Sequence, residues 1–318
     1  MPLTFVQWSV SLTGHPSICE WADRFWDNAV PQAVSNAAIA ACDALDGVPN
    51  DGMIEDPRKC RYDARSFVCG VSASPNYLTP AEADAVNKIW DGPVTSPDPN
   101  SHDRSARAWY GLERGASLGG LAGPGPFSIA VDHFRYWIKQ DPAFDWRTVT
   151  EASFFDDFLT SVEKFNEVIG TDDDLRDFRK AGGKMITYHG LFDQLIMPRG
   201  TYNYYNRVKD SLSDKQKYYR FFPYPNAGHC GGAGLNEGQL FSALVDWVEH
   251  GVEPEYLVAQ VSATRTRKIC KYPDVQMYNG IGGIDDHNSF TCQVRKKDDK
   301  ALLEQDKLAK GFEPKLGK

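Results

Sequence analysis

The sequence predicts an α/β fold in which short parallel strands lie buried between helices. Two runs of aromatic and β-branched residues, 184–188 and 218–223, have the length and composition of buried strands. The first run is apolar on both sides, which is typical of a parallel sheet that helices cover on both faces. Each run leads into a loop that carries one polar residue, and we expect the two loops to leave neighbouring strands at the same edge of the sheet.

The two polar residues are Asp193 and His229. A carboxylate after one strand and a histidine after the next form the acid and base of a Ser-His-Asp hydrolase, in the chain order that α/β-hydrolases use. The carboxylate would hold the imidazole in one tautomer, while the imidazole would take the proton from the nucleophile. Gly228, Gly231 and Gly232 would let the histidine loop approach that nucleophile closely. The alternative is that Asp193 is a helix N-cap and His229 an ordinary loop residue.

The segment YHGLFDQLIMPRGTYNYYNRV, followed by GHCGG, resembles the C-terminal catalytic segment of the tannase and feruloyl esterase family of secreted serine esterases. The resemblance joins the aspartate loop, the histidine–cysteine pair and their spacing. It implies an α/β-hydrolase core, present here only as its C-terminal strands, with a large inserted lid domain. It also implies hydrolysis of a phenolic (hydroxycinnamoyl or galloyl) ester, either a small molecule or linked to a polysaccharide, through an acyl-enzyme.

The resemblance divides the chain into four parts. They are an N-terminal remnant of the core at 1–30, a lid domain at 31–175, the C-terminal part of the core at 176–295 and a mobile charged tail at 296–318.

Helical patterns occur in the lid and in the core. Residues 30–42 and 154–169 repeat apolar residues at helical spacing. The segment 78–90 begins with Thr79 as N-cap and Pro80 at the first helical position. A further amphipathic helix, within 238–251, should end at Gly251.

An acidic loop follows the first of these helices. Its carboxylates, Asp43, Asp46 and Asp51, alternate with glycines and suit a hard cation, although the spacing is not that of an EF-hand. The loop resembles the calcium loop of the family's lid. The resemblance implies a structural Ca²⁺ bound by these three side chains and by the carbonyls of Val48 and Met53. The alternative is an Asx-rich turn held by a disulfide alone.

Seven cysteines are many for a cytosolic enzyme. The resemblance implies the disulfides Cys42–Cys60 and Cys270–Cys292. Closing a loop of roughly 20 residues contributes about 3 kcal/mol in the chain-entropy model. We therefore expect an oxidising compartment and, by family, a secreted protein. The family pairs the cysteine after the catalytic histidine with one directly before the serine, and no Cys-Ser dipeptide occurs here. Three cysteines have no predicted partner: Cys19, Cys69 and Cys230.

Residues 115–119, GASLG, match the G-x-S-x-G nucleophile elbow, and Ser117 precedes Asp193 and His229 in the required order. An elbow requires a buried strand before the serine and a helix after it. WYGLERG is not such a strand, and LGGLAGPGP cannot start a helix. We therefore expect Ser117 to lie in the lid and not to act as the nucleophile.

Without Ser117, the chain would carry the acid and the base but neither a nucleophile nor an oxyanion hole, so its activity alone is in question. Three hypotheses remain open: the C-terminal part of an esterase, a non-catalytic calcium-stabilised binding protein derived from one, and an active hydrolase that uses Ser117. On the first hypothesis, the strand at 184–188 would expose an unpaired edge and apolar surface, and the isolated chain would aggregate or associate.

Composition narrows the possible partners. The chain has 35 Lys plus Arg against 43 Asp plus Glu and no basic stripe before its tail, so we expect no nucleic-acid partner. No apolar run approaches the length of a membrane span, and the first residues lack the features of a signal peptide. The sequence does not predict an oligomeric state.

Overall fold

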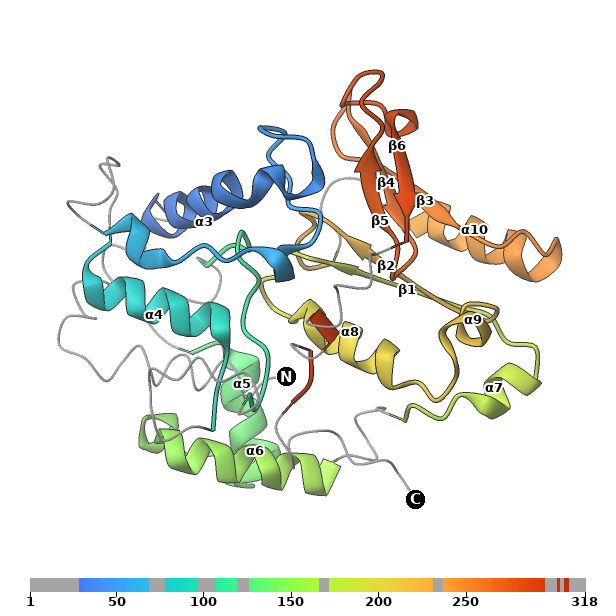
Figure 1. Ribbon diagram of the computed structural model, residues 1–318. Helices are drawn as coiled ribbons and strands as arrows, with labels where there is room; N and C mark the ends of the chain where they lie inside the picture. Colours follow the sequence, from blue (N-terminus) through green and yellow to red (C-terminus); the bar gives the residue numbers. More distant parts are fainter. Residues whose placement is uncertain are drawn as a thin grey trace.

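The computed structural model describes residues 29–68, 78–95, 107–118, 126–165, 172–230, 237–294, 302–303 and 306–308. Helices from the first half of the chain pack together on one side, and the strands lie with later helices on the other (Figure 1). Of the part expected to be a core remnant, residues 1–28 lie outside the described residues, as do Cys19 and Cys69.

The described part of the first half of the chain is mostly helical. Its longer helices are α3 (Ala29–Cys42), α4 (Pro80–Asp91) and α6 (Glu151–Phe165). Thr79 and Glu82 form a reciprocal capping box at the start of α4, so the predicted N-cap is confirmed. The shorter elements are η1 (Asp43–Asp46), η2 (Pro57–Lys59), η3 (Ala64–Phe67), α5 (Ser128–Asp132), the π-helix η5 (His133–Ile138) and η6 (Trp146–Thr148).

The two predicted strands are present, and they pair in parallel. β1 (Met185–Gly190) and β2 (Tyr219–Tyr224) begin and end within two residues of the predicted bounds, and Met185 lies opposite Tyr219 in the register. The connection between them contains α8 (Pro198–Arg207) and α9 (Leu212–Lys215). α7 (Arg176–Lys180) precedes β1.

Helices cover both faces of this strand pair, as predicted. Tyr219 and Phe221 pack with tyrosines of α8, whereas Phe222 and Tyr224 pack with Leu240 of α10 (Glu237–Glu249) and with the strands that follow. β2 is almost fully buried, but β1 is only half-buried. The reason is that β1 has one strand neighbour, β2, among the described residues. The prediction that β1 is a buried strand therefore holds only in part.

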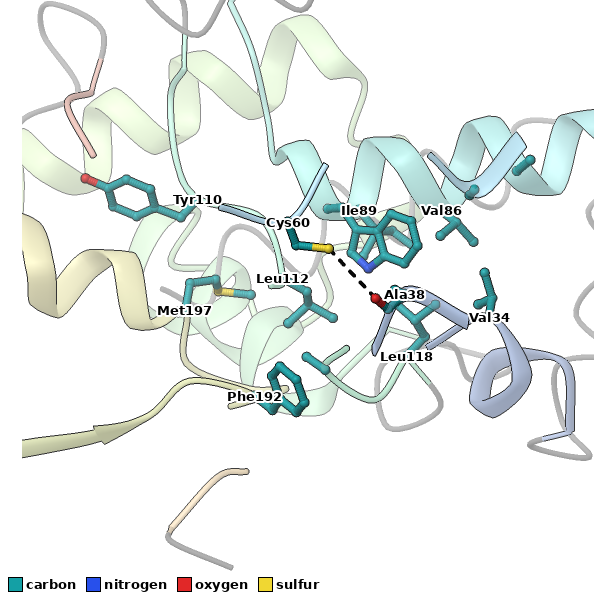
Figure 2. Close-up of a cluster of buried hydrophobic side chains, with 14 of the residues drawn as sticks. Val34, Ala38, Cys60, Val86, Ile89, Tyr110, Leu112, Leu118, Phe192 and Met197 are labelled. Atoms are coloured by element: carbon teal, nitrogen blue, oxygen red, sulfur yellow. Dashed lines mark hydrogen bonds between the residues drawn. The ribbon is translucent and has the colours of Figure 1, made fainter. Parts of the chain in front are cut away.

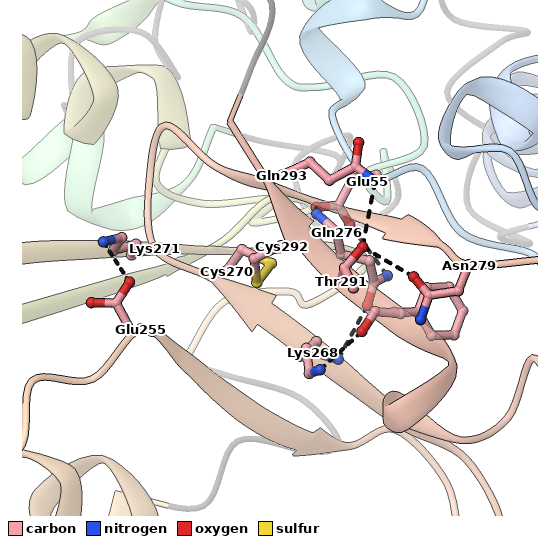
Figure 3. Close-up of a disulfide and its surroundings, with 11 residues drawn as sticks. Glu55, Glu255, Lys268, Cys270, Lys271, Gln276, Asn279, Thr291, Cys292 and Gln293 are labelled. Atoms are coloured by element: carbon pink, nitrogen blue, oxygen red, sulfur yellow. Dashed lines mark hydrogen bonds and ion pairs between the residues drawn. A yellow bond between two sulfur atoms is a disulfide. The ribbon is translucent and has the colours of Figure 1, made fainter.

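Two antiparallel hairpins that the sequence did not predict follow α10. β3 (Tyr256–Gln260) pairs with β4 (Thr266–Cys270), and β5 (Val275–Tyr278) pairs with β6 (Phe290–Gln293), which follows η7 (His287–Ser289). Figure 3 shows the disulfide that joins Cys270 on β4 to Cys292 on β6. The second predicted disulfide, Cys42–Cys60, closes the acidic loop. Both predicted pairings are confirmed.

The first half of the chain and the segment after β1 share buried side chains. Phe192 and Met197, which follow β1, pack into the same cluster as Leu112 and Leu118 (Figure 2). A buried ion pair adds to this contact, because Arg199 of α8 binds Glu113 at 2.5 and 3.0 Å. The segment after β1 is therefore fixed in place by residues of the first half of the chain.

Three of the five described residues of the predicted tail are buried. Asp306 is 2% exposed and binds the guanidinium of Arg58 at 2.8 Å, while its backbone carbonyl accepts hydrogen bonds from Tyr110 and Asn203. Leu302 and Leu308 are also buried. The prediction of a mobile charged tail is wrong at these positions, because the charge of Asp306 has a buried partner that the sequence pattern does not reveal.

Candidate active site

The structure brings the predicted acid and base together at the carboxyl ends of β1 and β2. Nδ1 of His229 lies 3.1 and 3.2 Å from the two carboxylate oxygens of Asp193. The side chain of Asp193 is 6% exposed and that of His229 is 33% exposed. The pair therefore joins a buried carboxylate to a histidine that is partly exposed to solvent.

A close backbone contact holds the two loops in this relation. A Cβ atom on Gly190 would lie 2.4 Å from the carbonyl oxygen of Ala227, so only glycine fits at the end of β1. Phe192 donates its N–H to the same carbonyl at 2.8 Å. On the other side, the N–H of His229 donates to the side-chain oxygen of Gln194 at 3.1 Å. These bonds set the distance between the loops.

Asp193 accepts hydrogen bonds on both oxygens. The N–H groups of Leu195 and Ile196 donate to Oδ1 at 2.8 Å each, and Nε2 of His189 lies 3.3 Å from Oδ2. Burial by itself would raise the pKa of Asp193, but the hydrogen bonds from His189, from these two N–H groups and from His229 outweigh it and lower the pKa. The carboxyl group is therefore held in its ionised form.

Asp193 is not the N-cap of the helix that follows. The N-cap position of α8 is Met197, and no side chain caps that end. The two backbone bonds that Asp193 accepts belong to the turn before the helix. The alternative of a simple helix cap therefore does not describe this residue.

The geometry decides which nitrogen of His229 carries the proton. A carboxylate can only accept, so Nδ1 donates to Asp193 and the neutral ring has its lone pair on Nε2. Within the described part of the chain, Nε2 makes no hydrogen bond. An imidazole in this state can accept a proton at Nε2, which is the function of the base in a Ser-His-Asp triad.

Ser117 does not occupy a nucleophile elbow. The residues before it, from Tyr110 onward, form turns and irregular structure, and its side chain is exposed. No hydrogen bond joins Ser117 to His229 in the described ranges. Residues 119–125, where the helix of an elbow would begin, lie outside those ranges.

Cys230 follows the histidine and has a free, exposed thiol, with its backbone at φ +56°. It forms no disulfide with any cysteine that the structure describes. Gly231 and Gly232, which were expected to give the loop its close approach, lie outside the described residues.

The acidic loop is closed by hydrogen bonds from its own backbone. Asp43 accepts from the N–H groups of Asn50, Gly52 and Met53, at 2.6 Å from Gly52 and 3.0 Å from Met53. Asp51, by contrast, accepts from Met53 at 2.9 Å and pairs with the fully buried guanidinium of Arg267 at 2.7 Å. Two of the three predicted carboxylates thus have polar partners in the protein.

The carboxylates of the acidic loop have some of the features of a cation site. Burial raises the pKa of Asp51, and the neighbouring Asp43 carboxylate adds to the rise while Arg267 opposes it. Two like charges therefore converge, as they do in a cation site. No group of three acidic, histidine or cysteine side chains that could hold a metal occurs among the described side chains, which do not include that of Asp46.

Three residues near the pair were not predicted from the sequence. His189 contacts the carboxylate of Asp193, Gln194 joins the two loops, and Asn226 binds the acidic loop. A polar residue inside an otherwise apolar strand was the available signal for His189. Nothing in the pattern distinguishes Gln194 or Asn226 from ordinary loop residues.

Parallel strands that end in a paired aspartate and histidine define an α/β-hydrolase-like protein. A model of the family described as "Tannase and feruloyl esterase" matches residues 5–293. The chain belongs to this family, and the resemblance stated from its motifs is confirmed.

Relatives and solved structures agree with this assignment. The chain is 34% identical, over 296 residues, to a probable feruloyl esterase of Arthroderma benhamiae, covering 84% of this chain and 53% of that relative. It is 31% identical to probable feruloyl esterase B-1 of Neosartorya fischeri, covering 89% of this chain and 57% of that relative. The crystal structure of feruloyl esterase B from Aspergillus oryzae superposes with a TM-score of 0.75 at 28% identity, covering 92% of this chain and 61% of that one. The chain thus spans a little over half the length of these proteins.

No helix in the described ranges is both long and apolar enough to cross a membrane.

Proposed function

We propose that the protein is a carboxylic ester hydrolase in which Asp193 and His229 are the acid and base of a Ser-His-Asp triad. The observation that carries this proposal is the hydrogen bond from Nδ1 of His229 to a buried carboxylate, which leaves Nε2 without a described partner. Family membership supports ester hydrolysis, and the names of the relatives favour esters of phenolic acids, hydroxycinnamoyl or galloyl, as substrates. The substrate would be a small ester or one linked to a polysaccharide.

In the proposed reaction, a serine hydroxyl attacks the ester carbonyl and passes its proton to Nε2 of His229. Asp193 stabilises the imidazolium that forms. The imidazolium then gives the proton to the departing alcohol, and the acyl group remains on the serine. Water, deprotonated by the same nitrogen, releases the acid and restores the serine. We propose that the serine and the oxyanion hole lie outside the described residues.

A second function, a non-catalytic calcium-stabilised binding protein, is the alternative. The observation that favours it is that no described serine forms a hydrogen bond with His229. An active hydrolase that uses Ser117 is a third possibility, which the exposed and irregular surroundings of that serine disfavour.

A fluorophosphonate probe tests for an activated serine, and hydrolysis of methyl ferulate and methyl gallate tests for the reaction. We expect His229→Ala and Asp193→Asn to abolish both signals. The matched control is the exposed pair of Asp246 on α10 and His250 just after it, which are in contact at 3.2 Å and should tolerate the same changes. Labelling that His229→Ala leaves intact would refute the triad. If Ser117→Ala abolished the fluorophosphonate labelling, Ser117 would be identified as the nucleophile.

We also propose a structural Ca²⁺ in the acidic loop, bound by Asp43, Asp46 and Asp51 and by the carbonyls of Val48 and Met53. The convergence of Asp43 on Asp51 supports a cation there, although Arg267 already neutralises part of the charge. Calcium would raise the melting temperature by mass action. Equal melting temperatures in excess calcium and in chelator would refute this proposal. Asp46→Ala should remove any calcium effect, while Asp246→Ala on the surface should not.

The two disulfides support secretion, because structural disulfides persist in oxidising compartments. We propose that the protein acts outside the cell.

A further inference from the structure

His189 is the second imidazole at the carboxylate of Asp193. It lies near the end of β1 with its side chain 11% exposed, on the face of the strand pair that α8 covers. Nε2 is 3.0 Å from the carbonyl oxygen of Ile196 and 3.3 Å from Oδ2 of Asp193. Nδ1 is 2.7 Å from the hydroxyl of Thr201 on α8.

These contacts define the tautomer of the neutral ring. The carbonyl of Ile196 and the carboxylate of Asp193 can only accept, so Nε2 carries the proton and donates to them. Nδ1 then has the lone pair and accepts from the hydroxyl of Thr201. His189 thus has a described partner on each side.

Each oxygen of Asp193 has donors besides His229. Oδ1 accepts from the N–H groups of Leu195 and Ile196, whereas Oδ2 has His189 as its one other described donor. His229 reaches both oxygens at similar distances. Two imidazoles, those of His189 and His229, therefore donate hydrogen bonds to Oδ2.

We propose that His189, oriented by Thr201, is a positioning residue that orients Oδ2 of Asp193 and stabilises its charge, and thereby keeps His229 in its neutral, proton-accepting form. This inference rests on the proposed triad. His189 acts through Asp193 and has no described contact with His229.

The physical reason is the poor solvation of a buried carboxylate. When one donor is removed, the remaining charge attracts the imidazolium form of His229 more strongly, and the pKa of His229 rises. The backbone bonds to Oδ1 keep Asp193 in place, so the effect on His229 is electrostatic and not a loss of contact. His189 and His229 are the titratable side chains that contact Asp193 among the described residues.

Four variants test this inference. His189→Leu removes the donor to Oδ2, while His189→Gln keeps an N–H group near the position of Nε2. Thr201→Val removes the hydroxyl that orients the ring, and Thr201→Ser keeps it. Melting temperatures identify any variant that fails to fold. If His189→Leu does not fold, Thr201→Val provides the measurement, with Thr201→Ser as its control.

The first readout does not need activity. In ¹⁵N-histidine NMR titrations of the 318-residue chain, we expect the pKa of His229 to rise by about half a unit or more in His189→Leu. Thr201→Val should give a smaller rise, and His189→Gln and Thr201→Ser should match the parent. An unchanged or lower pKa of His229 in folded His189→Leu would overturn the inference.

The second readout is the rate of ester hydrolysis, measured with methyl ferulate or methyl gallate as substrate. We expect His189→Leu to lower kcat about tenfold, with KM unchanged and the acid limb of the pH profile at higher pH. Full activity in Asp193→Asn and His229→Ala would refute the triad itself. Their inactivity beside a fully active His189→Leu would refute only the role of His189.

Discussion

The side-chain amide of Asn226 donates a hydrogen bond to the carbonyl of Gly52 at 2.5 Å and thereby ties the loop that carries His229 to the acidic loop. The amide oxygen of Asn226 also accepts from the N–H of Ile54 at 3.1 Å. Asn226 has a left-handed backbone with φ +57°, a conformation that asparagine adopts more readily than most residues. The histidine loop is therefore held from two sides, by β1 and by the acidic loop.

Loss of the Asn226 side chain should weaken this tie. We expect Asn226→Gly, which keeps the left-handed backbone without strain, to lower the free energy of unfolding by about 2 kcal/mol through two lost hydrogen bonds. Asn226→Ala should cost more, because alanine adds backbone strain at this φ. Urea unfolding monitored by tryptophan fluorescence measures both. A glycine variant as stable as the parent would show that the tie contributes nothing.

The contact between the two loops requires a glycine at position 190. In Gly190→Ala the new methyl group would meet the carbonyl oxygens of Ala227 and Gly228 at 2.4 and 2.6 Å and push the loops apart. We expect a loss of about 2 kcal/mol or more in stability and a broken bond between Asp193 and His229. Gly283→Ala is the control, because a Cβ there meets nothing within 4 Å. Equal melting temperatures for the two variants would contradict this prediction.

The buried ion pair of Arg58 and Asp306 should contribute strongly to stability. Asp306→Ala leaves the buried guanidinium of Arg58 with Asp56 as its one described ion-pair partner, and we expect a loss of about 2–3 kcal/mol. The more exposed pair of Arg176 and Asp174 is the control, and Asp174→Ala should cost much less stability, because solvent screens this pair. Chemical unfolding of both variants tests the contrast. Equally small losses of stability in Asp306→Ala and Asp174→Ala would contradict the prediction and would indicate that Asp306 is solvated.

The pH dependence of stability should depend in part on His133. Burial lowers the pKa of His133 to about 4, below its ordinary value of about 6.5. Between these values the unfolded chain binds the proton and the folded protein does not, so stability rises with pH and this contribution is complete above about pH 6.5. Nε2 of His133 forms a hydrogen bond with the hydroxyl of Ser161 at 3.0 Å, which holds the ring in its buried position. His133→Gln should flatten the slope of unfolding free energy between pH 4 and about 6.5. An unchanged slope would contradict the prediction.

Asp193 should contribute in the same direction, but at lower pH. Its folded pKa lies below the unfolded value of about 3.9, so its stabilising effect is present above that value and is lost as pH falls through the folded pKa. Asp193→Asn removes this dependence. The stability difference between the parent and the variant should therefore shrink in acid. A difference that is constant from pH 6 to pH 2.5 would argue against an ionised carboxylate in the folded protein.

The sequence by itself was sufficient for the local features. Strand composition predicted β1 and β2, the Thr79 signal predicted the start of α4, and the motifs around Asp193 and His229 predicted the family and both disulfides. These features depend on residue type over a few neighbouring positions, or on a motif whose spacing is itself the signal. The elements around β1 and β2, however, were predicted incompletely. The hairpins from β3 to β6 were missed, because short strands with mixed polar and apolar residues have no strong period.

Only the tertiary structure decided which distant residues meet. His189 reads as one polar residue in an apolar strand until α8 brings Thr201 to one nitrogen and the turn brings Asp193 to the other. Asp306 reads as part of a charged tail until Arg58 pairs with it across 248 positions. Such contacts depend on the packing of whole elements, and the free energy that favours them is absent from any local window of sequence. The donors that solvate a buried carboxylate come from several elements, so their combined effect on its ionisation exists only in the fold.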